Sequence, residues 1–444
     1  MSMAKKQQIG HSVPLVAIDL GSHGIRAMAA EMTENGILRV LGVETSSKFD
    51  CVKKGIVDNT TDAGYMINEV LKKLSNRIHV DALPSAFVCV GGRTMQLVQI
   101  SSRRDQVRKR EIQQTLLDSL EIECKRKIER HYPDVAVLDL IPNYYVLDGV
   151  EQDHIPTPDQ KAALIEGHFI AFVGKKELEQ KVYDSFNRSG KILEHMYVRP
   201  DALLTAIASD DDITNGCVIL DLGAQTTTLT VYKGNQYMYN KVIAMGGYDI
   251  TRDIEQTRMP FAYAEQLKCK YGYAMAELVK TNHRFRIPAP SLPQGEVTLL
   301  ATELADMITD RLDQIIAPLI NEINQEANRF KVLYITGGGA MLQGIAQYIQ
   351  SLTKIQVMYG SHAVWLTADT PDEICMPVYS SLVGTLLLGA SYRTAHPIEK
   401  ETNKSLFRRL KDKLEEETLT LFTEQEEQPI KHNEEKQGSN TETN

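Results

Sequence analysis

The sequence predicts an α/β protein whose core is duplicated into two related halves. The first observation is a repeated motif, Ile18-Asp19-Leu20-Gly21 and Leu220-Asp221-Leu222-Gly223. The second is that each copy ends an apolar, strand-like run and is followed by two further runs of that kind. The third is a glycine triplet, Gly337–Gly339, at the end of another apolar run. Because a repeated sequence pattern indicates a repeated structural unit, we expect two similar halves.

The composition is that of a globular protein. The chain has 444 residues, of which 43% are hydrophobic, and a formal net charge of −9. This acidic balance argues against a nucleic-acid partner, since such proteins carry a basic background. The six cysteines are scattered, which predicts neither a zinc site nor a disulfide framework. No apolar run of roughly eighteen residues is present, and the polar start does not resemble a signal peptide, so we expect a soluble, cytosolic protein.

The first half opens with a meander and continues with a helix and a strand. Hairpin turns separate the three meander strands, which we place at Val13–Leu20, Arg26–Ala30 and Ile37–Glu44. Apolar residues at helical spacing predict a helix over Asp62–Ile78, and Ser85–Val90 is an apolar strand that ends at two glycines. We assign 13–95 to this part of the half.

Residues 96–172 change in character, and we interpret them as an inserted subdomain with its own helix and sheet. The charge-rich segment Arg103–Arg110 is expected to be a solvated approach to a helix over Glu111–Glu129. Strand-like pieces follow at Val135–Ile141, Tyr144–Leu147 and Leu164–Val173. A helix over Lys175–Asn187 then returns the chain to the first half, whose second part spans 173–212.

The second half repeats the opening pattern around a helical insertion. Its meander strands are expected at Cys217–Leu222, Thr226–Tyr232 and Gln236–Ile243. The region 246–330 is mostly helical by pattern, with helices over Ile250–Gln256 and Leu299–Ala327, the second bent at Pro318. The core, 213–245 and 331–395, is completed by these elements: strand Val332–Thr336, helix Leu342–Leu352, strand Ile355–Met358 and helix Pro377–Tyr392.

The three glycine turns predict a site for the phosphates of a nucleotide. Backbone N–H groups hold a phosphate best where small residues let the chain approach it closely. A carboxylate beside such a turn would repel the phosphate, so Asp19 and Asp221 are expected to hold a hydrated magnesium ion or to position water. The chain has neither a P-loop nor a Rossmann fingerprint. It also shows no evident catalytic base, so a catalytic residue stays unassigned and any ATP hydrolysis is expected to be slow.

Three segments resemble the nucleotide-binding motifs of the actin/Hsp70/hexokinase superfamily of ATPases. IDLGSHGIR (18–26) and LDLGAQTTTL (220–229) resemble its two phosphate motifs, and YITGGGAMLQGI (334–345) its adenosine motif. The resemblance implies an actin-like fold of two related domains around a cleft for ATP and Mg²⁺, with Asp19 and Asp221 beside the metal. The nucleotide contacts that it implies are Asp19, Gly21, Ser22, Arg26, Asp221, Gly223, Thr226, Gly246, Gly247, Glu265, Lys268, Gly337, Gly338 and Gly339.

Within the superfamily, the chain is most similar to the FtsA family of bacterial cell-division proteins. VKKGIVDNTTDAG (52–64) and MGGYDITRDIEQ (245–256) resemble family segments, and the insert at 96–172 lies where FtsA carries its own subdomain. The resemblance implies a scaffold at the cytoplasmic face of the cell membrane, at the division septum. It implies self-association into actin-like protofilaments, a tether for the tubulin-like partner FtsZ near Arg311, and binding of later division proteins through the inserted subdomain.

The C-terminal segment gives an argument that does not depend on resemblance. In KSLFRRLKDKL (404–414), four large apolar residues fall on one face of a helix and basic residues flank them. Such a helix can bury its apolar face in a headgroup layer while its cations reach lipid phosphates. The expected membrane residues are Leu406, Phe407, Arg408, Arg409, Leu410, Lys411 and Leu414. We therefore expect a linker at 396–403, a membrane-targeting helix at 404–422 and a disordered tail at 423–444; by pattern alone, a helix packed on the body is the alternative.

Two rival functions stay open at this point. A small-molecule kinase of the same fold would hold a sugar or an acid in the cleft beside ATP. A pilus-assembly-type ATP-binding adaptor would have no need of the basic C-terminal helix. His23, in the first phosphate turn, is interpreted as a turn residue rather than a phosphate contact.

Overall fold

The computed structural model describes residues 13–396, apart from 48–49, 153, 235, 258, 289–294 and 327–328. The linker beyond 396, the amphipathic helix, the tail and all the expected membrane residues lie outside the described residues. The chain divides into two compact units, 1–391 and 392–444, and the fold below is that of the first. Among the described residues, no helix combines the length and the apolar character needed to cross a bilayer.

The first five-stranded sheet has the order β11-β6-β1-β2-β3. Its meander strands are antiparallel, while β6 and β11 add in parallel on the other side of β1. Helix α1 begins at Asn59, whose side chain caps it by accepting hydrogen bonds from the amides of Thr61 and Asp62. The elements are β1 (Leu15–Gly21), β2 (Gly24–Met32), β3 (Leu38–Thr45), β4 (Val52–Lys53), β5 (Ile56–Val57), α1 (Thr60–Arg77), β6 (Ser85–Val90), α3 (Lys176–Ser189), β11 (Ile192–Val198), α4 (Arg199–Ile207) and α5 (Asp210–Asn215).

The second five-stranded sheet has the order β14-β13-β12-β17-β18. Its antiparallel meander is extended in parallel by β17 and β18, as the first sheet is by β6 and β11. The two sheets therefore share one topology, which confirms the expected duplication. The elements are β12 (Cys217–Leu222), β13 (Thr227–Lys233), β14 (Gln236–Ile243), β17 (Val332–Thr336), α10 (Ile345–Leu352), β18 (Gln356–Tyr359) and α11 (Ser380–Ala395).

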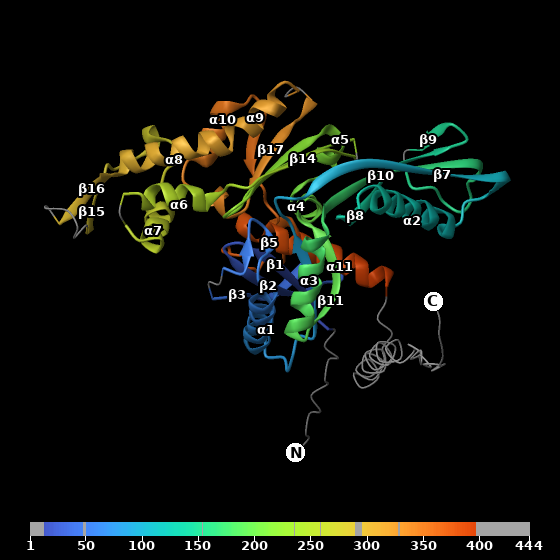
Figure 1. The fold of residues 1–444 in the computed structure, drawn as a ribbon, viewed down its shortest axis with the longest axis horizontal. Coiled ribbons are helices and arrows are strands. Elements are labelled where there is room, and N and C mark those ends of the chain that lie inside the picture. The colour runs from blue at the N-terminus through green and yellow to red at the C-terminus, as the bar shows by residue number, and fades with distance from the viewer. Residues whose placement is uncertain are drawn as a thin grey trace, which may run out of the picture. The chain divides into compact units, whose positions relative to one another are not determined.

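Between the two parts of the first half, a four-stranded antiparallel sheet of order β7-β10-β8-β9 carries helix α2 on one face (Figure 1). The segment Arg103–Arg110 is largely exposed, as expected, but it is not a loop before the helix: it is part of the edge strand β7, in which Arg103, Arg104, Asp105 and Arg110 pair with β10. The two strand-like pieces expected before residue 148 form one strand, β8, with a register shift near Pro142. The elements are β7 (Gln96–Glu111), α2 (Gln114–His131), β8 (Val135–Leu147), β9 (Val150–Gln152) and β10 (Lys161–Lys175).

The region between β14 and β17 is helical except for one hairpin. The single bent helix expected over Leu299–Ala327 is instead two helices, which separate at Ile316. Pro318 lies in the first turn of the second helix, where its missing N–H removes no hydrogen bond. The hairpin was not expected. The elements are α6 (Gly247–Glu255), α7 (Phe261–Tyr271), β15 (Arg284–Pro288), β16 (Glu296–Leu300), α8 (Ala301–Ile315) and α9 (Ala317–Asn324).

Helices α4 and α11 cross at a point that only glycine permits. A Cβ added at Gly384 of α11 would lie 1.7 Å from the backbone oxygen of Ala202 in α4. Farther along α11, a Cβ at Gly389 would lie 2.6 Å from the ring of Phe87 in β6. The crossing fixes the start of α4, and thereby Arg199, beside the ends of the parallel strands.

Candidate functional site

The three glycine turns expected to bind phosphate line one cavity of about 370 Å³. It also takes in the start of α6 and one side of α7. Every residue that the sequence suggested as a nucleotide contact lies in its wall: Asp19, Gly21, Ser22, Arg26, Asp221, Gly223, Thr226, Gly246, Gly247, Glu265, Lys268, Gly337, Gly338 and Gly339. Residues far apart in the sequence are thus brought together by the two sheets.

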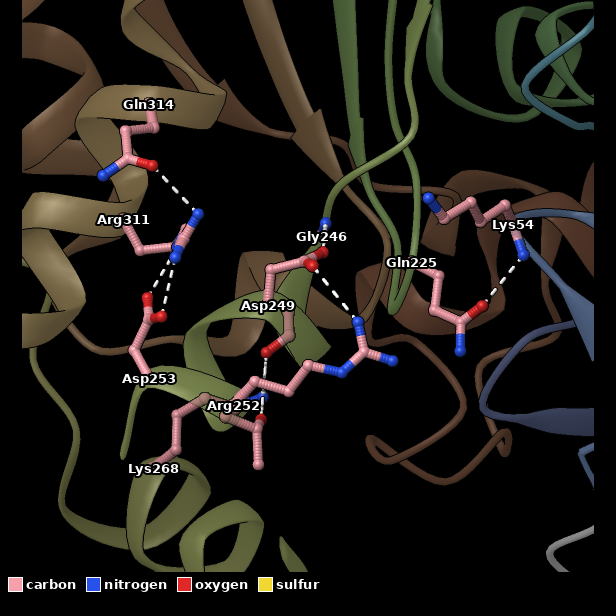
Figure 2. Close-up of polar contacts among 11 residues, drawn as sticks. Lys54, Gln225, Gly246, Asp249, Arg252, Asp253, Lys268, Arg311 and Gln314 are labelled. Carbon is pink, nitrogen blue, oxygen red and sulfur yellow. Dashed lines mark hydrogen bonds and ion pairs between the residues drawn. The ribbon is translucent and has the colours of Figure 1, made fainter. Parts of the chain in front are cut away.

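The turn between β12 and β13 is docked tightly on the first turn of α6. The amides of Gly247 and Tyr248 donate to the carbonyl oxygens of Gly223 and Ala224, at 2.9 and 2.7 Å. A Cβ at Gly246 would lie 2.4 Å from the oxygen of Gly223, so the approach requires glycine. The carboxylate of Asp249 accepts a hydrogen bond from the Gly246 amide at 2.8 Å (Figure 2). Because the α6 amides are used in this way, the second turn and α6 form one rigid wall.

The glycine triplet after β17 has members with different surroundings. Gly337 has φ +81°, and a Cβ there would lie 2.4 Å from the Asp221 carboxylate. A Cβ at Gly339 would lie 2.7 Å from that of Leu222. Gly338 differs, since a Cβ added there would meet nothing within 4 Å and would project into open space. Packing against β12 therefore explains why Gly337 and Gly339 are glycines. It does not explain Gly338.

Arg199, which the sequence analysis missed, lies between the two aspartates. Its Nη2 donates to Asp19 Oδ1, and its Nε is 3.9 Å from Asp221 Oδ2. The side chains of Arg199, Asp19 and Asp221 are 18%, 4% and 11% exposed. Burial alone would lower the pKa of Arg199, but Asp19 and then Cys89 and Asp221 raise it above its usual value. A sequence signal was available, because Arg199 directly follows an apolar strand, as the two aspartate turns do.

Asp221 is the less well compensated of the two carboxylates. Burial raises its pKa, the nearby guanidinium of Arg199 opposes the change, and the charge of Asp19 adds to it. The site thus contains two carboxylates and one arginine, and the arginine stays protonated under all ordinary conditions.

Glu265 and Lys268 form a network with the start of α6. The Lys268 ammonium donates to Glu265 Oε2 at 2.7 Å, to the Gly247 oxygen at 2.7 Å and to Thr251 Oγ1 at 2.8 Å. Burial alone would raise the pKa of Glu265, but the Lys268 charge and the hydrogen bonds hold it below its usual range. Because an ammonium has three N–H donors and all three bond within the protein, Lys268 holds α7 against α6 in this conformation.

Two hydrogen bonds connect the halves across the mouth of the cavity. His23 Nδ1, in the first turn, is 2.8 Å from the hydroxyl of Tyr248 at the start of α6. The Lys54 amide, in the β4–β5 turn, donates to Gln225 Oε1 at 2.8 Å (Figure 2). In the first turn itself, Ser22 Oγ accepts from the Gly55 amide at 3.2 Å. These contacts join the two halves beside the cavity.

Arg311, the expected partner residue, lies on α8 and is not part of the cavity wall. Its Nε and Nη2 each approach an oxygen of Asp253 at 2.6 Å, and its Nη1 donates to Gln314 (Figure 2). The hydrogen bond and the charge of Asp253 raise the pKa of Arg311. The bidentate pair holds α6 against α8, so in this structure the guanidinium is bound within the protein.

Comparisons with known proteins agree with this architecture. A family model, "Cell division protein FtsA", matches residues 218–384. The cell division protein FtsA of Porphyromonas gingivalis is 26% identical over 346 residues, which cover 76% of this chain and 70% of the relative. FtsA of Borreliella burgdorferi is 25% identical over 410 residues, which cover 88% and 94%.

Solved structures of low sequence identity share the fold. The PilM–PilN type IV pilus biogenesis complex has a chain 15% identical with a TM-score of 0.58, covering 84% of this chain and 98% of that one. MreB5 of Spiroplasma citri bound to ADP is 11% identical with a TM-score of 0.54, covering 87% and 99%. These are actin-like ATPase folds, as the sequence led us to expect. The family-model match over 218–384 and the curated relatives support the recognition of this chain as similar to the FtsA cell division proteins.

Proposed function

We propose that this chain binds an adenine nucleotide in the cavity and acts as a cell-division scaffold. It would self-associate into actin-like protofilaments and tether FtsZ to the cytoplasmic membrane at the septum. The observation that carries the nucleotide proposal is the convergence of the three glycine turns and the α6–α7 network on one cavity. That MreB5, a protein of the same fold, was solved bound to ADP supports it.

The cavity suits a nucleotide in size and in the distribution of its lining. Its volume of about 370 Å³ lies within the range of small-molecule sites. The glycine turns offer backbone to phosphate, while the accessible side chains of Met341 and Leu342 give an apolar surface on which a base can lie. Gly338, whose missing side chain no protein contact explains, is the point at which we expect ligand and backbone to approach most closely.

Magnesium, which the superfamily implies, does not fit the two aspartates as they stand. The ion prefers six oxygen ligands at about 2.0–2.1 Å and keeps several waters. Here Asp19 and Asp221 share the guanidinium of Arg199, which an ion bound between the two carboxylates would have to displace. No part of the proposed function therefore depends on a resident metal.

The scaffold reading is preferred over the two rivals because the family match and the curated relatives are cell division proteins. The remaining finer parts are proposals of the same kind. They are an FtsZ contact on α8 near Arg311, a partner surface on the inserted subdomain at 96–172, and membrane binding through 404–422. Hydrolysis is proposed to be slow at most.

Substitution of Gly338 tests the nucleotide proposal. Gly338→Leu should leave the fold intact, since its Cβ meets no protein atom, and should abolish binding of a fluorescent ATP analogue. Ala363→Leu, an exposed position outside the cavity wall, is the matched control and should bind as the original chain does. Full affinity in a Gly338→Leu protein with an unchanged melting temperature would show that the nucleotide does not bind in this cavity.

The membrane proposal has its own test. Removal of 404–444 should abolish sedimentation with anionic liposomes and leave the melting temperature of the body unchanged. Leu406→Glu should reproduce the loss by placing a charge on the apolar face. A truncated protein that still sediments, or that melts well below the full chain, would contradict the proposal.

A further inference from the structure

We propose that Arg199 is a built-in counter-ion of the cleft. Its guanidinium occupies the place between Asp19 and Asp221 that a divalent cation would need, so this chain binds nucleotide phosphates without requiring magnesium. The inference rests on the proposed nucleotide binding and goes beyond it, since it assigns a role to a residue and predicts how the site depends on metal.

The backbone fixes where this arginine stands. Strands β1, β6 and β11 run in parallel, with Asp19 opposite Cys89 and Val198 opposite Val90. The carboxyl ends of these strands therefore meet at one edge of the sheet, and Arg199 is the first residue after β11. Asp221 approaches the same edge from the second sheet, in which β12 ends next to the Gly337 turn. The arginine and both carboxylates are thus placed by strands rather than by a loose loop.

The backbone next to Arg199 also leaves space for its side chain. A Cβ added at Gly91 would lie 3.1 Å from Arg199 Nε and 3.6 Å from its Cβ and Cδ. The arginine stem therefore lies over the bare backbone that follows β6. With 18% of its side chain exposed, Arg199 is largely enclosed yet still reaches the cavity wall. This is a built site for a guanidinium and not a surface contact.

The balance of charges in the site explains the role of Arg199. Two buried carboxylates facing a triphosphate repel it unless a positive charge lies between them. Arginine supplies a charge that cannot be lost, and a planar group with five N–H donors that suits carboxylate and phosphate oxygens alike. Nη2 is engaged by Asp19, and Nε faces Asp221 from a longer distance. The guanidinium can therefore serve both the carboxylates and a phosphate in the cavity.

A divalent ion at this place would first have to displace the guanidinium. Separating a buried ion pair leaves an uncompensated charge, which proteins tolerate poorly. Magnesium can still accompany the nucleotide on its solvent side, but the affinity of the protein for the phosphates should hardly depend on it.

The test measures binding of a fluorescent ATP analogue to the full chain, in excess magnesium and in excess EDTA. The original protein should bind with dissociation constants that differ by less than about threefold between the two conditions. Arg199→Gln keeps N–H donors but removes the charge, and its affinity should fall by about tenfold or more in EDTA relative to magnesium. Arg77→Gln breaks another arginine–carboxylate pair, with Glu44 and outside the cavity wall, and should respond to EDTA as the original protein does.

The outcomes separate the inference from the proposed function. An original protein that binds in magnesium and loses binding in EDTA would overturn the inference and leave nucleotide binding standing. Binding in neither condition would overturn the proposed function. An Arg199→Gln protein whose binding is as insensitive to EDTA as the original would show that Arg199 is not the counter-ion.

A second readout needs no nucleotide. Manganese uptake by the nucleotide-free protein, followed by electron paramagnetic resonance, should reveal a site in Arg199→Gln that the original protein lacks. The double variant Arg199→Gln, Asp221→Asn should lose that site again, because one of the freed carboxylates is gone. No gain of manganese in a folded Arg199→Gln protein would mean that the arginine does not hold a cation's place.

Discussion

The two aspartate turns occupy matching places in two sheets of the same strand order, yet the chain around them differs. The second turn is fastened by backbone hydrogen bonds to α6, the first helix of the helical region that follows β14. The first turn has no such helix behind it, and Ser22 instead accepts a hydrogen bond from the short β4–β5 turn. Asp19 bonds directly to Arg199, while Asp221 is 3.9 Å from it. Duplication thus sets where the turns are, and the segments that follow them set what each can do.

The sharpest test of this difference compares Asp19→Asn with Asp221→Asn. Asp19→Asn removes the direct partner of a largely buried arginine and should lower the free energy of unfolding by about 4 kcal/mol. Asp221→Asn should change it by less than about 1 kcal/mol, because loss of a carboxylate whose pKa is raised by burial also relieves a desolvation cost. Urea unfolding of both variants measures this. Equal losses would mean that Arg199 is shared evenly between the two carboxylates.

Alanine substitutions at glycines of the two turn regions should also lower stability by unequal amounts. A Cβ at Gly246 would lie 2.4 Å from a backbone oxygen of the second turn, whereas one at Gly21 would lie 3.1 Å from the oxygen of Gly24. We expect Gly246→Ala to cost about 3 kcal/mol and Gly21→Ala about 1 kcal/mol. Thermal unfolding measured by circular dichroism gives the comparison. A Gly21→Ala protein that melts below Gly246→Ala would contradict the view that the second turn is the more tightly docked.

A second buried carboxylate, which lies outside the cavity, can be compared with Asp221. In β8, burial raises the pKa of Asp139 to about 7, and the charge of Asp201 adds to the shift. The folded protein then holds a proton on Asp139 that the unfolded chain releases near pH 4, so this group makes stability fall as pH rises from about 4 to about 7. Asp139→Asn should stabilise the protein by about 2 kcal/mol at pH 8 and change little at pH 4, because a buried amide still carries some desolvation cost.

Chemical unfolding at the two pH values checks this, with Asp369→Asn as the control. Hydrogen bonds lower the pKa of Asp369, first that of Thr367, so it contributes stability that is present at neutral pH and lost in acid. Because that loss occurs below about pH 4, Asp369→Asn should leave the difference in stability between pH 4 and pH 8 nearly unchanged, whereas Asp139→Asn should change it. A profile that Asp139→Asn leaves unchanged would mean that its carboxyl group titrates normally.

The smallest expected effect concerns the contacts across the mouth. Tyr248→Phe removes the hydrogen bond to His23 and should cost about 1 kcal/mol or less of stability. Because the bond joins the halves, its loss should speed nucleotide release more than it lowers the melting temperature. Stopped-flow release of a fluorescent analogue measures the rate, and Tyr239→Phe, outside the cavity wall, is the control. Unchanged release would show that this contact does not hold the cleft closed.

The sequence analysis correctly placed the strands that are followed by glycine turns. Ser85–Val90, Cys217–Leu222, Gln236–Ile243 and Val332–Thr336 have the bounds expected for them. Their signal is local, since an apolar run and a following glycine lie within a few residues of each other. Helix ends were less well placed, because caps such as Asn59 lie outside the apolar pattern.

Segments whose structure depends on a distant partner were misjudged. The basic run Arg103–Arg110 has no strand pattern of its own and is extended because β10 pairs with it. The β15–β16 hairpin was missed for a related reason, since its two strands are short and the apolar spacing after Leu299 suggested helix.

What the sequence by itself determined is the duplicated α/β core and the three glycine turns that line its cavity. Both follow from motifs in which the relevant residues are neighbours in the chain. Only the tertiary structure decided that Arg199 meets Asp19, from which it is separated by 180 positions. That meeting depends on the register of three parallel strands and on the bare backbone at Gly91. No local pattern encodes such a contact, because parallel strands are paired through segments far apart in sequence.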